Sequence, residues 1–249
     1  MNSILKNCIV SLLLLLITAC GKEETKNQHN CKAPIVINLE AVVSNLPLEL
    51  QTSLYNDYLG RKYKIELLKF YLSNWALEKS NGELIYLDEI NLIDFSSDEL
   101  LNIEADVDTG IYVNLHFGIG LDSLTNALDP SEFETSHPMS IAQNTYWTWA
   151  SKYKFFMIEG RIDTMGGNTP DLIFSYHTGF NDLYREVSIP LNNLVIDHAT
   201  DVLQLELDID QVVNGTNGTI DFVDQSFSHS IDELTVTISN NLVGAFSIH

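Results

Sequence analysis

Apolar and polar residues alternate in short runs along much of the chain, a pattern typical of β-strands that bury one face. The alternation is strict in 203–209, Leu-Gln-Leu-Glu-Leu-Asp-Ile, and partial in 35–43, 153–162, 172–176 and 185–189. A longer β-like run covers 63–78, and the apolar run 84–95 follows it after Asn81-Gly82. Because Asn-Gly fits the tight turns of hairpins, this arrangement predicts a pair of antiparallel strands.

Helical patterns are few. Residues 112–119 predict another strand, and 122–128 predict a short helix that Asp122 caps. The tail is ambiguous, because 235–238 favours a strand whereas apolar residues recur at helical spacing from 231 to 246. Many short strands with few helices predict an all-β fold, an antiparallel β-sandwich with a few short helices. No linker or internal repeat divides residues 34–249, which we expect to form a single domain.

The N-terminus has the pattern of a processing signal rather than of a folded element. Lys6 precedes the apolar run 9–17, which is too short to span a bilayer as a permanent helix. The run leads into Ile-Thr-Ala-Cys at 17–20, which resembles the lipobox of bacterial lipoproteins. We therefore expect residues 1–19 to be a lipoprotein signal peptide and Cys20 to carry the lipid that anchors the protein to a membrane.

Residues 20–33 are polar and lack apolar periodicity, so we expect a flexible tether after the lipidated Cys20. Lys-Glu-Glu at 22–24 resembles the short acidic signal that sends some Gram-negative lipoproteins to the cell surface. The expected location is the outer membrane, on its periplasmic face or at the cell surface. Cys8 leaves with the signal peptide and Cys20 is lipidated, so Cys31 has no partner for a disulfide within the mature chain.

The chain is strongly acidic, with 34 Asp and Glu against 13 Lys and Arg and a formal net charge of −21. Such a charge repels nucleic-acid phosphates, which argues against a nucleic-acid partner. It also repels anionic lipid, so attachment to the membrane is expected to depend on the lipid anchor. A cation or a positively charged partner is favoured at long range.

Candidate metal ligands lie within and after an aromatic segment, 136–160. It contains Trp147 and Trp149, which face the same side if the segment is a strand. His137 precedes them on a Pro-marked loop, and His177 ends the apolar strand 172–176. If these strands end at one rim of the sandwich, His137, Trp147 and His177 come together. Two imidazoles suit copper or zinc, and an aromatic lid that excludes water favours Cu(I). Each residue taken alone is more typical of an ordinary role, a surface or capped histidine at a strand end or a tryptophan packed in the core or at its rim.

Several short blocks occur in a specific order along the chain. They are Lys-Phe-Tyr-Leu-Ser-Asn at 69–74, Phe-Gly-Ile-Gly-Leu-Asp at 117–122, Leu-Asp-Pro at 128–130, Tyr-Trp-Thr-Trp-Ala-Ser-Lys-Tyr-Lys-Phe at 146–155, Ile-Glu-Gly at 158–160, Tyr-His-Thr-Gly at 176–179 and Asn-Asn-Leu-Val-Gly-Ala-Phe at 240–246. Together they resemble the MbnP-like family of periplasmic or surface copper-binding proteins, first linked to methanobactin systems. The resemblance extends from about residue 35 to the end.

The resemblance implies an antiparallel β-rich fold and a mononuclear copper site. In relatives, that site uses histidines and a tryptophan that a partner di-haem peroxidase of the MauG type oxidises to kynurenine. Carried over to this chain, the resemblance implies His137 and His177 as ligands and Trp147 as the modified residue, with Trp149 as the alternative. Further metal candidates are His116 and His229. The implied function is copper capture or handover outside the cytoplasm.

Two other classes of function compete with copper binding. A non-metal interaction module would bind a glycan or a protein on a platform formed by Trp147 and Trp149. An enzyme is not expected, because the sequence contains no nucleophile elbow, phosphate-binding loop or zinc-protease motif.

Overall fold

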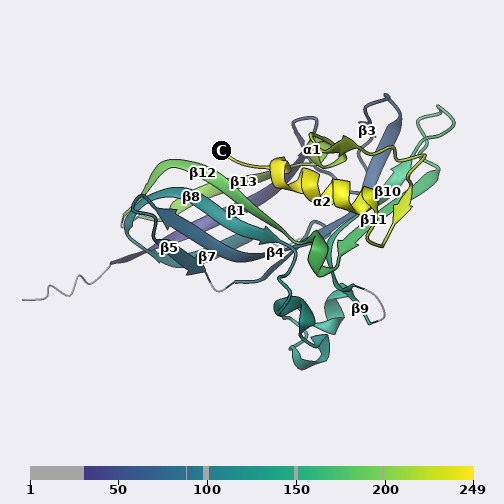
Figure 1. The fold of residues 1–249 in the computed structure, drawn as a ribbon. Coiled ribbons are helices and arrows are strands. Elements are labelled where there is room, and N and C mark those ends of the chain that lie inside the picture. Colours follow the sequence, from purple (N-terminus) through teal and green to yellow (C-terminus); the bar gives the residue numbers. More distant parts are fainter. Residues whose placement is uncertain (1–30, 88, 98–100, 149–150, 198) are drawn as a thin grey trace, which may run out of the picture.

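A computed structural model describes residues 31–87, 89–97, 101–148, 151–197 and 199–249, and Figure 1 shows how its elements are arranged. The expected signal peptide, Cys20, most of the expected tether and Trp149 lie outside the described residues. Most of the described chain forms strands that assemble into two large sheets. Within the described part of the chain, no helix has both the length and the apolar character needed to cross a membrane.

One sheet is built on strand β1 (Lys32–Val43), which begins inside the segment expected to be tether. β1 pairs in parallel with β13 (Asp201–Asp208). Its other edge pairs antiparallel with β7 (Asn102–Asp108) and with β2 (Leu46–Pro47). Strand β17 (Phe246–Ile248) completes the sheet by pairing antiparallel with β13.

The second sheet follows the order β12-β8-β4-β10-β11-β16. These strands are β12 (Arg185–Ile196), β8 (Gly110–Ile119), β4 (Lys62–Lys79), β10 (Lys152–Ile162), β11 (Leu172–Gly179) and β16 (Phe227–Ser228). Short strands β3 (Tyr55–Asn56), β5 (Leu84–Leu87) and β6 (Asn91–Asp94) pair with β4, and β9 (Tyr146–Trp147) pairs with β10. A separate small hairpin joins β14 (Asn214–Gly215) and β15 (Gly218–Thr219).

The long strand β4 links the two ends of this second sheet. Residues 63–70 of β4 pair with β10, and residues 72–79 pair with β8. The register with β8 shifts between Ser73 and Ala76, where Asn74 has a positive φ of 53°, a conformation that Asn tolerates better than most residues. The pair β10–β11 thus extends beyond the sandwich, on the right in Figure 1.

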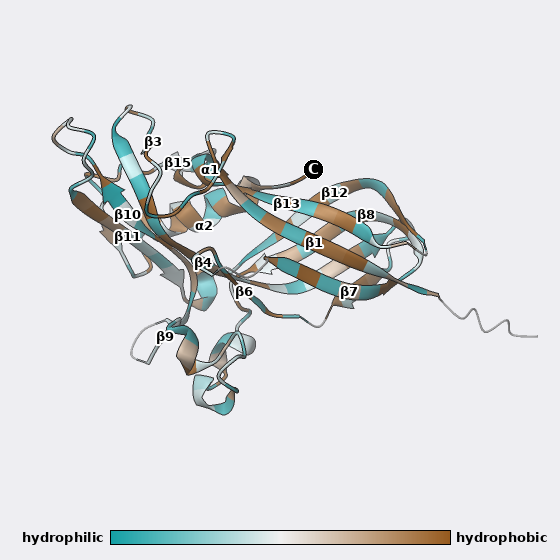
Figure 2. Cartoon of the chain, turned by 180° about the vertical axis from the view of Figure 1, so that it is seen from behind, coloured by the Kyte–Doolittle hydropathy of each residue, from teal (hydrophilic) through white to brown (hydrophobic). Residues whose placement is uncertain are grey.

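The core lies between the two sheets. Figure 2 shows alternating hydrophobic and hydrophilic bands along strands such as β1 and β7, as expected for strands with one buried face. Aromatic rings fill the middle of the core: Phe70 stacks on Phe156 with centroids 5.6 Å apart and meets Phe246 edge-on at 6.1 Å. Trp75 is fully buried against Phe117, so this third tryptophan has a packing role.

The segment between β8 and β9 forms a smaller second cluster below the sheet (Figure 1). It contains three 3-10 turns: η1 (Thr125–Ala127), η2 (Pro130–Glu132) and η3 (Ile141–Gln143). The hydroxyls of Tyr71 and Tyr153 donate to the backbone carbonyls of Pro138 and Met139, at 2.8 and 3.0 Å. The short helix predicted at 122–128 is a single 3-10 turn, η1, and the carboxylate of Asp122 accepts from the backbone N–H groups of Leu124 and Thr125 at its start.

The ambiguous tail is a helix, α2 (Glu233–Ala245), and lies against β11 and β12. Its buried face carries Leu234, Ile238 and Leu242, which recur at helical spacing. Asp232 and Thr235 form a reciprocal capping box at its start. Helical spacing and the cap therefore override the local strand preference of 235–238. Two shorter helical elements are α1 (Ile209–Val213) and the 3-10 turn η4 (Asn181–Leu183).

Replacing Asp232 with alanine is expected to lower the free energy of unfolding by about 1 kcal/mol, because it removes the side chain that accepts from Thr235 N at 3.0 Å. Urea unfolding measures the change. Glu134→Ala is the matched control, since it removes an exposed carboxylate outside α2. Equal destabilisation by the two variants would show that lost charge, not the cap, is responsible.

The predicted all-β sandwich is confirmed, as is the hairpin at Asn81-Gly82 between β4 and β5. The prediction that its strands are antiparallel is wrong in two places, because β1–β13 and β11–β16 are parallel pairs. Parallel neighbours need long crossover connections rather than tight turns. These pairs join strands that are remote in sequence, so no local turn signal marks them.

Candidate metal centre

Strands β10 and β11 place three polar side chains together. Glu159 on β10 lies opposite Ser175 on β11, and His177 follows two residues later on the same face of β11. Nε2 of His177 is 2.6 Å from Oε1 of Glu159. Oγ of Ser175 is 3.3 Å from the same oxygen. The Glu159 carboxylate therefore joins both residues of β11.

A second histidine comes from the short strand β16. This strand runs parallel to β11 with Tyr176 opposite Ser228, which brings the next residues, His177 and His229, side by side. Their rings stack with centroids 3.9 Å apart and planes 4° apart. Nε2 of His229 is 2.9 Å from Oγ of Ser175. The two imidazoles thus share the Glu159–Ser175 pair.

Trp147 contacts both imidazoles. Its strand, β9, pairs with the start of β10, and its ring centroid lies 5.4 Å from that of His177 and 5.2 Å from that of His229. Nζ of Lys154 lies 5.2 Å from the centroid of the Trp147 ring, within the range of a cation–π interaction. The ring of Phe227 lies 4.0 Å from that of His229. Aromatic rings therefore border the histidine pair on more than one side.

Burial keeps the two histidines uncharged. It lowers the pKa of His177 to about 3, and the positive charge of Lys154 adds to the effect. Burial also lowers the pKa of His229 to about 4, with contributions from His177 and Lys154. At neutral pH the contact between His177 and Glu159 is therefore a hydrogen bond from a neutral ring to a carboxylate rather than an ion pair. Neutral imidazole is the form that binds metals.

Nδ1 of His177 is buried and has no hydrogen-bond partner among the described residues. Buried polar atoms in proteins are normally hydrogen-bonded, so an orphaned imidazole nitrogen is a candidate metal-binding atom.

The cluster is not a preformed multidentate site. Among the described residues, no group of three or more His, Cys, Asp or Glu side chains is arranged to hold a metal ion. The rings of His177 and His229 are nearly parallel, so their in-plane lone pairs lie side by side and do not converge until one ring turns. Two neutral nitrogens beside aromatic rings suit a soft, low-coordinate ion such as Cu(I) better than a hard ion that requires many oxygen ligands.

The structure brings together His177 and Trp147 of the residues singled out from the sequence, but it places His137 elsewhere. The ring of His137 stacks on Phe133 with centroids 4.3 Å apart, and its Nδ1 accepts from Met139 N at 3.0 Å. The second cluster below the sheet holds this loop. His229, one of the further candidates, occupies the place beside His177 that sequence reasoning gave to His137.

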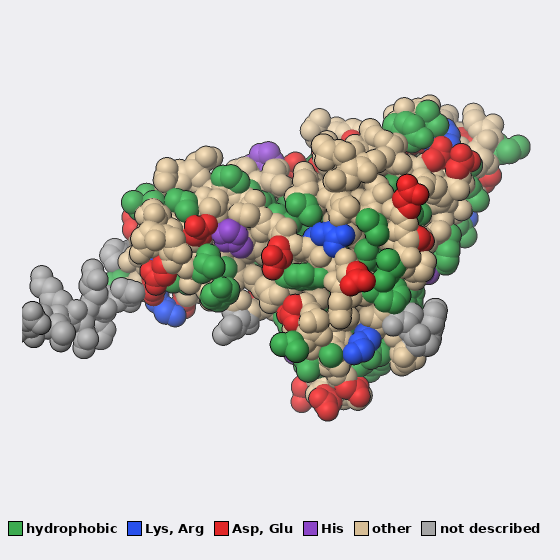
Figure 3. All heavy atoms as spheres, in the orientation of Figure 1, with side chains coloured by type: hydrophobic (Ala, Val, Ile, Leu, Met, Phe, Trp, Pro, Cys, Tyr) green, Lys and Arg blue, Asp and Glu red, His purple; other side chains and the backbone are tan. Residues whose placement is uncertain are grey.

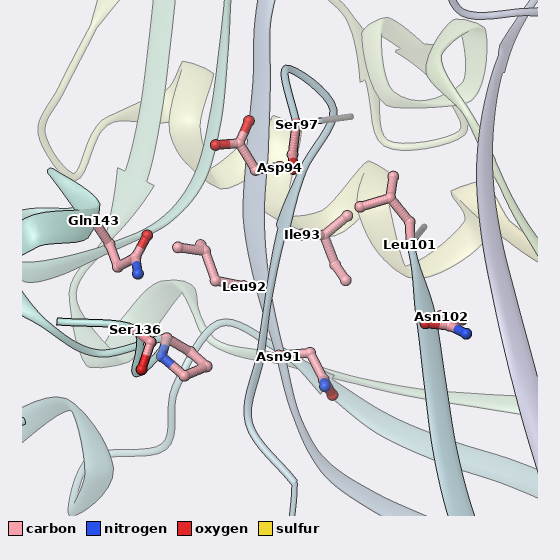
Figure 4. Close-up of a pocket in the computed structure, with 10 residues that line it drawn as sticks. Asn91, Leu92, Ile93, Asp94, Ser97, Leu101, Asn102, Ser136 and Gln143 are labelled. Carbon is pink, nitrogen blue, oxygen red and sulfur yellow. The ribbon is translucent and has the colours of Figure 1, made fainter. Parts of the chain in front are cut away.

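The other candidates also lie apart from the pair. Nε2 of His116 is 3.1 Å from Glu78, in a cleft of about 490 Å³ on the face formed by β4, β5, β8 and β12. Tyr86 and Glu186 also line this cleft. Trp149 lies outside the described residues. A further cleft of about 310 Å³, shown in Figure 4, is lined by polar side chains of β6 and by residues next to His137.

Sequence reasoning missed Glu159, Ser175 and Lys154. The signal for Glu159 was present: it is the one charged residue in the apolar run 155–160 of β10. Ser175 precedes His177 by two residues, which places both on one face once the strand is assigned. Nothing local marks the approach of Lys154 to Trp147.

Acidic side chains are spread over the face of the molecule seen in Figure 3 and gather at the tip of the β8–β9 segment, at the bottom of the view. Exposed acidic residues of that segment are Asp129, Glu132 and Glu134. The field of so many carboxylates attracts cations to the surface at long range.

Comparison with known proteins gives one family and one similar solved structure. The family model described as MbnP matches residues 32–232, which include every strand from β1 to β16 and both residues of the histidine pair. Among solved structures, MbnP from Methylosinus trichosporium is similar, with a TM-score of 0.58 and 12% sequence identity over 88% of this chain and 98% of that chain. At this identity the likeness establishes the fold alone. No curated protein matches.

Proposed function

The chain belongs to the MbnP family, and we propose that it is a lipid-anchored copper-binding protein outside the cytoplasm that holds Cu(I) at His177 and His229. The observation that carries the proposal is the pair of neutral, stacked imidazoles in contact with Trp147. The buried, unpartnered Nδ1 of His177 supports it. Copper capture or handover is the role that such a site, on a tethered acidic domain, would serve.

The residues of the cluster fit copper chemically. His177 and His229 would supply imidazole nitrogens, which bind copper well. Trp147 is the residue we propose for conversion to kynurenine by a di-haem peroxidase partner of the MauG type, with hydrogen peroxide as the oxidant. Two peroxides would add two oxygen atoms across the opened indole double bond and leave as water, and hydrolysis of the resulting N-formyl group would release formate, which leaves an amine and a ketone. Because Trp147 contacts both histidine rings, those new groups would lie beside the imidazoles.

Location outside the cytoplasm is supported by the lipobox-like sequence before Cys20 and by the polar segment that follows it. The net charge of −21 favours the approach of a cation and disfavours direct contact with anionic lipid. A lipid on Cys20 would therefore hold the protein at the outer membrane, on its periplasmic face or at the cell surface, while the acidic domain stays clear of the bilayer.

The competing idea of a glycan or protein platform finds less support at Trp147. This side chain is partly buried and packs on the two histidine rings, whereas a platform residue would present its ring to solvent. Tryptophan fluorescence of protein in which Trp147 is unmodified separates the two ideas. Quenching by copper, with no response to glycans, supports the proposed function.

Titration of the mature protein from its native host with Cu(I), against a chromophoric competitor, tests the proposal. One bound copper per chain is expected. Absence of competition for Cu(I) by correctly folded protein would contradict it.

Copper affinity is expected to stay nearly constant from about pH 7 to about pH 5. Protons compete with a metal only near or below the pKa of its ligands, and burial lowers the pKa of His177 to about 3 and that of His229 to about 4. Histidines with an ordinary pKa of about 6.5 would each lose about tenfold in affinity per pH unit below that value. Competition titrations at several pH values decide between these outcomes. A steep loss of copper affinity beginning near pH 6 would contradict the claim that the buried histidine pair binds the copper.

A further inference from the structure

A chain of polar contacts links the two histidines through Ser175 and Glu159. Oε1 of Glu159 is 2.6 Å from Nε2 of His177 and 3.3 Å from Oγ of Ser175. Oγ of Ser175 is in turn 2.9 Å from Nε2 of His229. Both imidazoles therefore direct Nε2, rather than Nδ1, toward this series of contacts, which ends at the Glu159 carboxylate.

The Glu159 carboxylate determines which groups donate the hydrogen bonds in this series of contacts. An ionised carboxylate only accepts hydrogen bonds, so Nε2 of His177 must carry the hydrogen in its contact with Glu159. The single hydroxyl hydrogen of Ser175 is drawn to the same charged acceptor, because charge-assisted hydrogen bonds are the stronger ones. The oxygen of Ser175 is then left to accept, and Nε2 of His229 donates to it.

A neutral imidazole carries one N–H, so a hydrogen on Nε2 leaves Nδ1 with a free lone pair. We infer that Glu159, directly for His177 and through Ser175 for His229, keeps both rings in this tautomer and makes Nδ1 of each ring the metal-binding atom. Glu159 is thus a positioning residue for the site. The buried, unpartnered Nδ1 of His177 is where such a lone pair is expected.

The choice of Nδ1 as ligand rests on the proposed function, whereas the tautomers are a property of the metal-free protein. Metal ligands of this type usually direct their other nitrogen to a carboxylate or a carbonyl, and such outer partners contribute about 10–100-fold in metal affinity. Here one carboxylate would serve two ligands. Glu159 therefore controls the site without touching the metal.

Nitrogen-15 NMR of the metal-free protein tests the tautomers directly. Long-range correlation spectra are expected to show a protonated Nε2 and an unprotonated Nδ1 for both His177 and His229. A protonated Nδ1 on either ring would overturn the inference. If the tautomers are as expected but the wild-type protein binds no copper, the proposed function fails and the tautomer assignment stands.

The variant Glu159→Met removes the acceptor while keeping a side chain of similar length. Ser175 is then free to donate to Nε2 of His229, so this ring is expected to move toward the Nδ1-protonated tautomer, and copper affinity is expected to fall by about 10–100-fold. Glu78→Met is the matched control, since Glu78 contacts His116 at 3.1 Å outside the site. This control should leave the tautomer of His229 and the copper affinity unchanged.

A second variant, Ser175→Ala, keeps the test decisive if Glu159→Met does not fold. It cuts the link to His229 but leaves the 2.6 Å contact between Glu159 and His177 intact. The His229 spectrum should change while the His177 spectrum should not. Unchanged His229 tautomers and unchanged copper affinity in the folded variants would overturn the inference.

Discussion

Replacing His177 and His229 together with alanine is expected to abolish copper binding by the mature protein. The variant removes both imidazoles of the stacked pair and leaves Trp147 with no nitrogen ligand beside it. Each single variant is expected to lose more than the about 10–100-fold that removal of an outer partner costs, because a ligand itself is lost. Competition titration with Cu(I) measures the stoichiometry and affinity of all three proteins.

Alanine variants of His137 and His116 are the matched controls. Both rings lie apart from the pair, against Phe133 and Glu78 respectively, so copper binding should be retained. Circular dichroism establishes that each variant is folded. Unchanged copper stoichiometry in the double variant would contradict the assignment of His177 and His229 as ligands. A loss of copper in His137→Ala would indicate that His137 is a ligand.

Replacing Gly160 with alanine is expected to destabilise the protein by about 3 kcal/mol. A Cβ at this position would lie 2.1 Å from the carbonyl oxygen of Lys64 and 2.5 Å from the ring of Phe174. The carbonyl belongs to the neighbouring strand β4, so the overlap is relieved only if β10 and β4 move apart. For a domain of this size the melting temperature should fall by about 6–12 °C. Because Gly160 follows Glu159, copper affinity should fall as well.

The same substitution at Gly244 is the control. Gly244 lies exposed near the end of α2, and a Cβ there would meet nothing within 4 Å. Alanine is the better helix former, so this variant should be stabilised by up to about 1 kcal/mol. Differential scanning calorimetry compares the two variants. An unchanged melting temperature for Gly160→Ala would contradict the close packing of β10 against β4.

Most strands were predictable because each carries its own pattern. Strict alternation locates β13, and the Asn81-Gly82 turn locates the β4–β5 hairpin. The parallel pair β1–β13 was not predictable, since it depends on the packing of strands remote in sequence. The tail was ambiguous because local strand preference and helical spacing compete there, and the Asp232 cap and burial against β11 and β12 favour the helix.

The candidate site was only partly predictable for a related reason. His177 and Trp147 lie on strands with clear patterns, and the order of motifs along the chain supplied the family. His229 follows β16, a strand of two residues whose parallel pairing with β11 has no sequence signal. His137 lies on a loop, and its position is set by the neighbouring Pro138 and Met139, whose carbonyls accept from the Tyr71 and Tyr153 hydroxyls of the second cluster.

The most direct test of the central claim is combined metal analysis and intact-mass measurement of the protein from its native host. One copper per chain is expected, together with a mass that shows one oxygen gained and one carbon lost at a tryptophan, which peptide mapping should locate at Trp147. A mass with every tryptophan unmodified would contradict kynurenine formation. Folded native protein that contains no copper and binds none on addition would contradict the claim that His177 and His229 form a copper site.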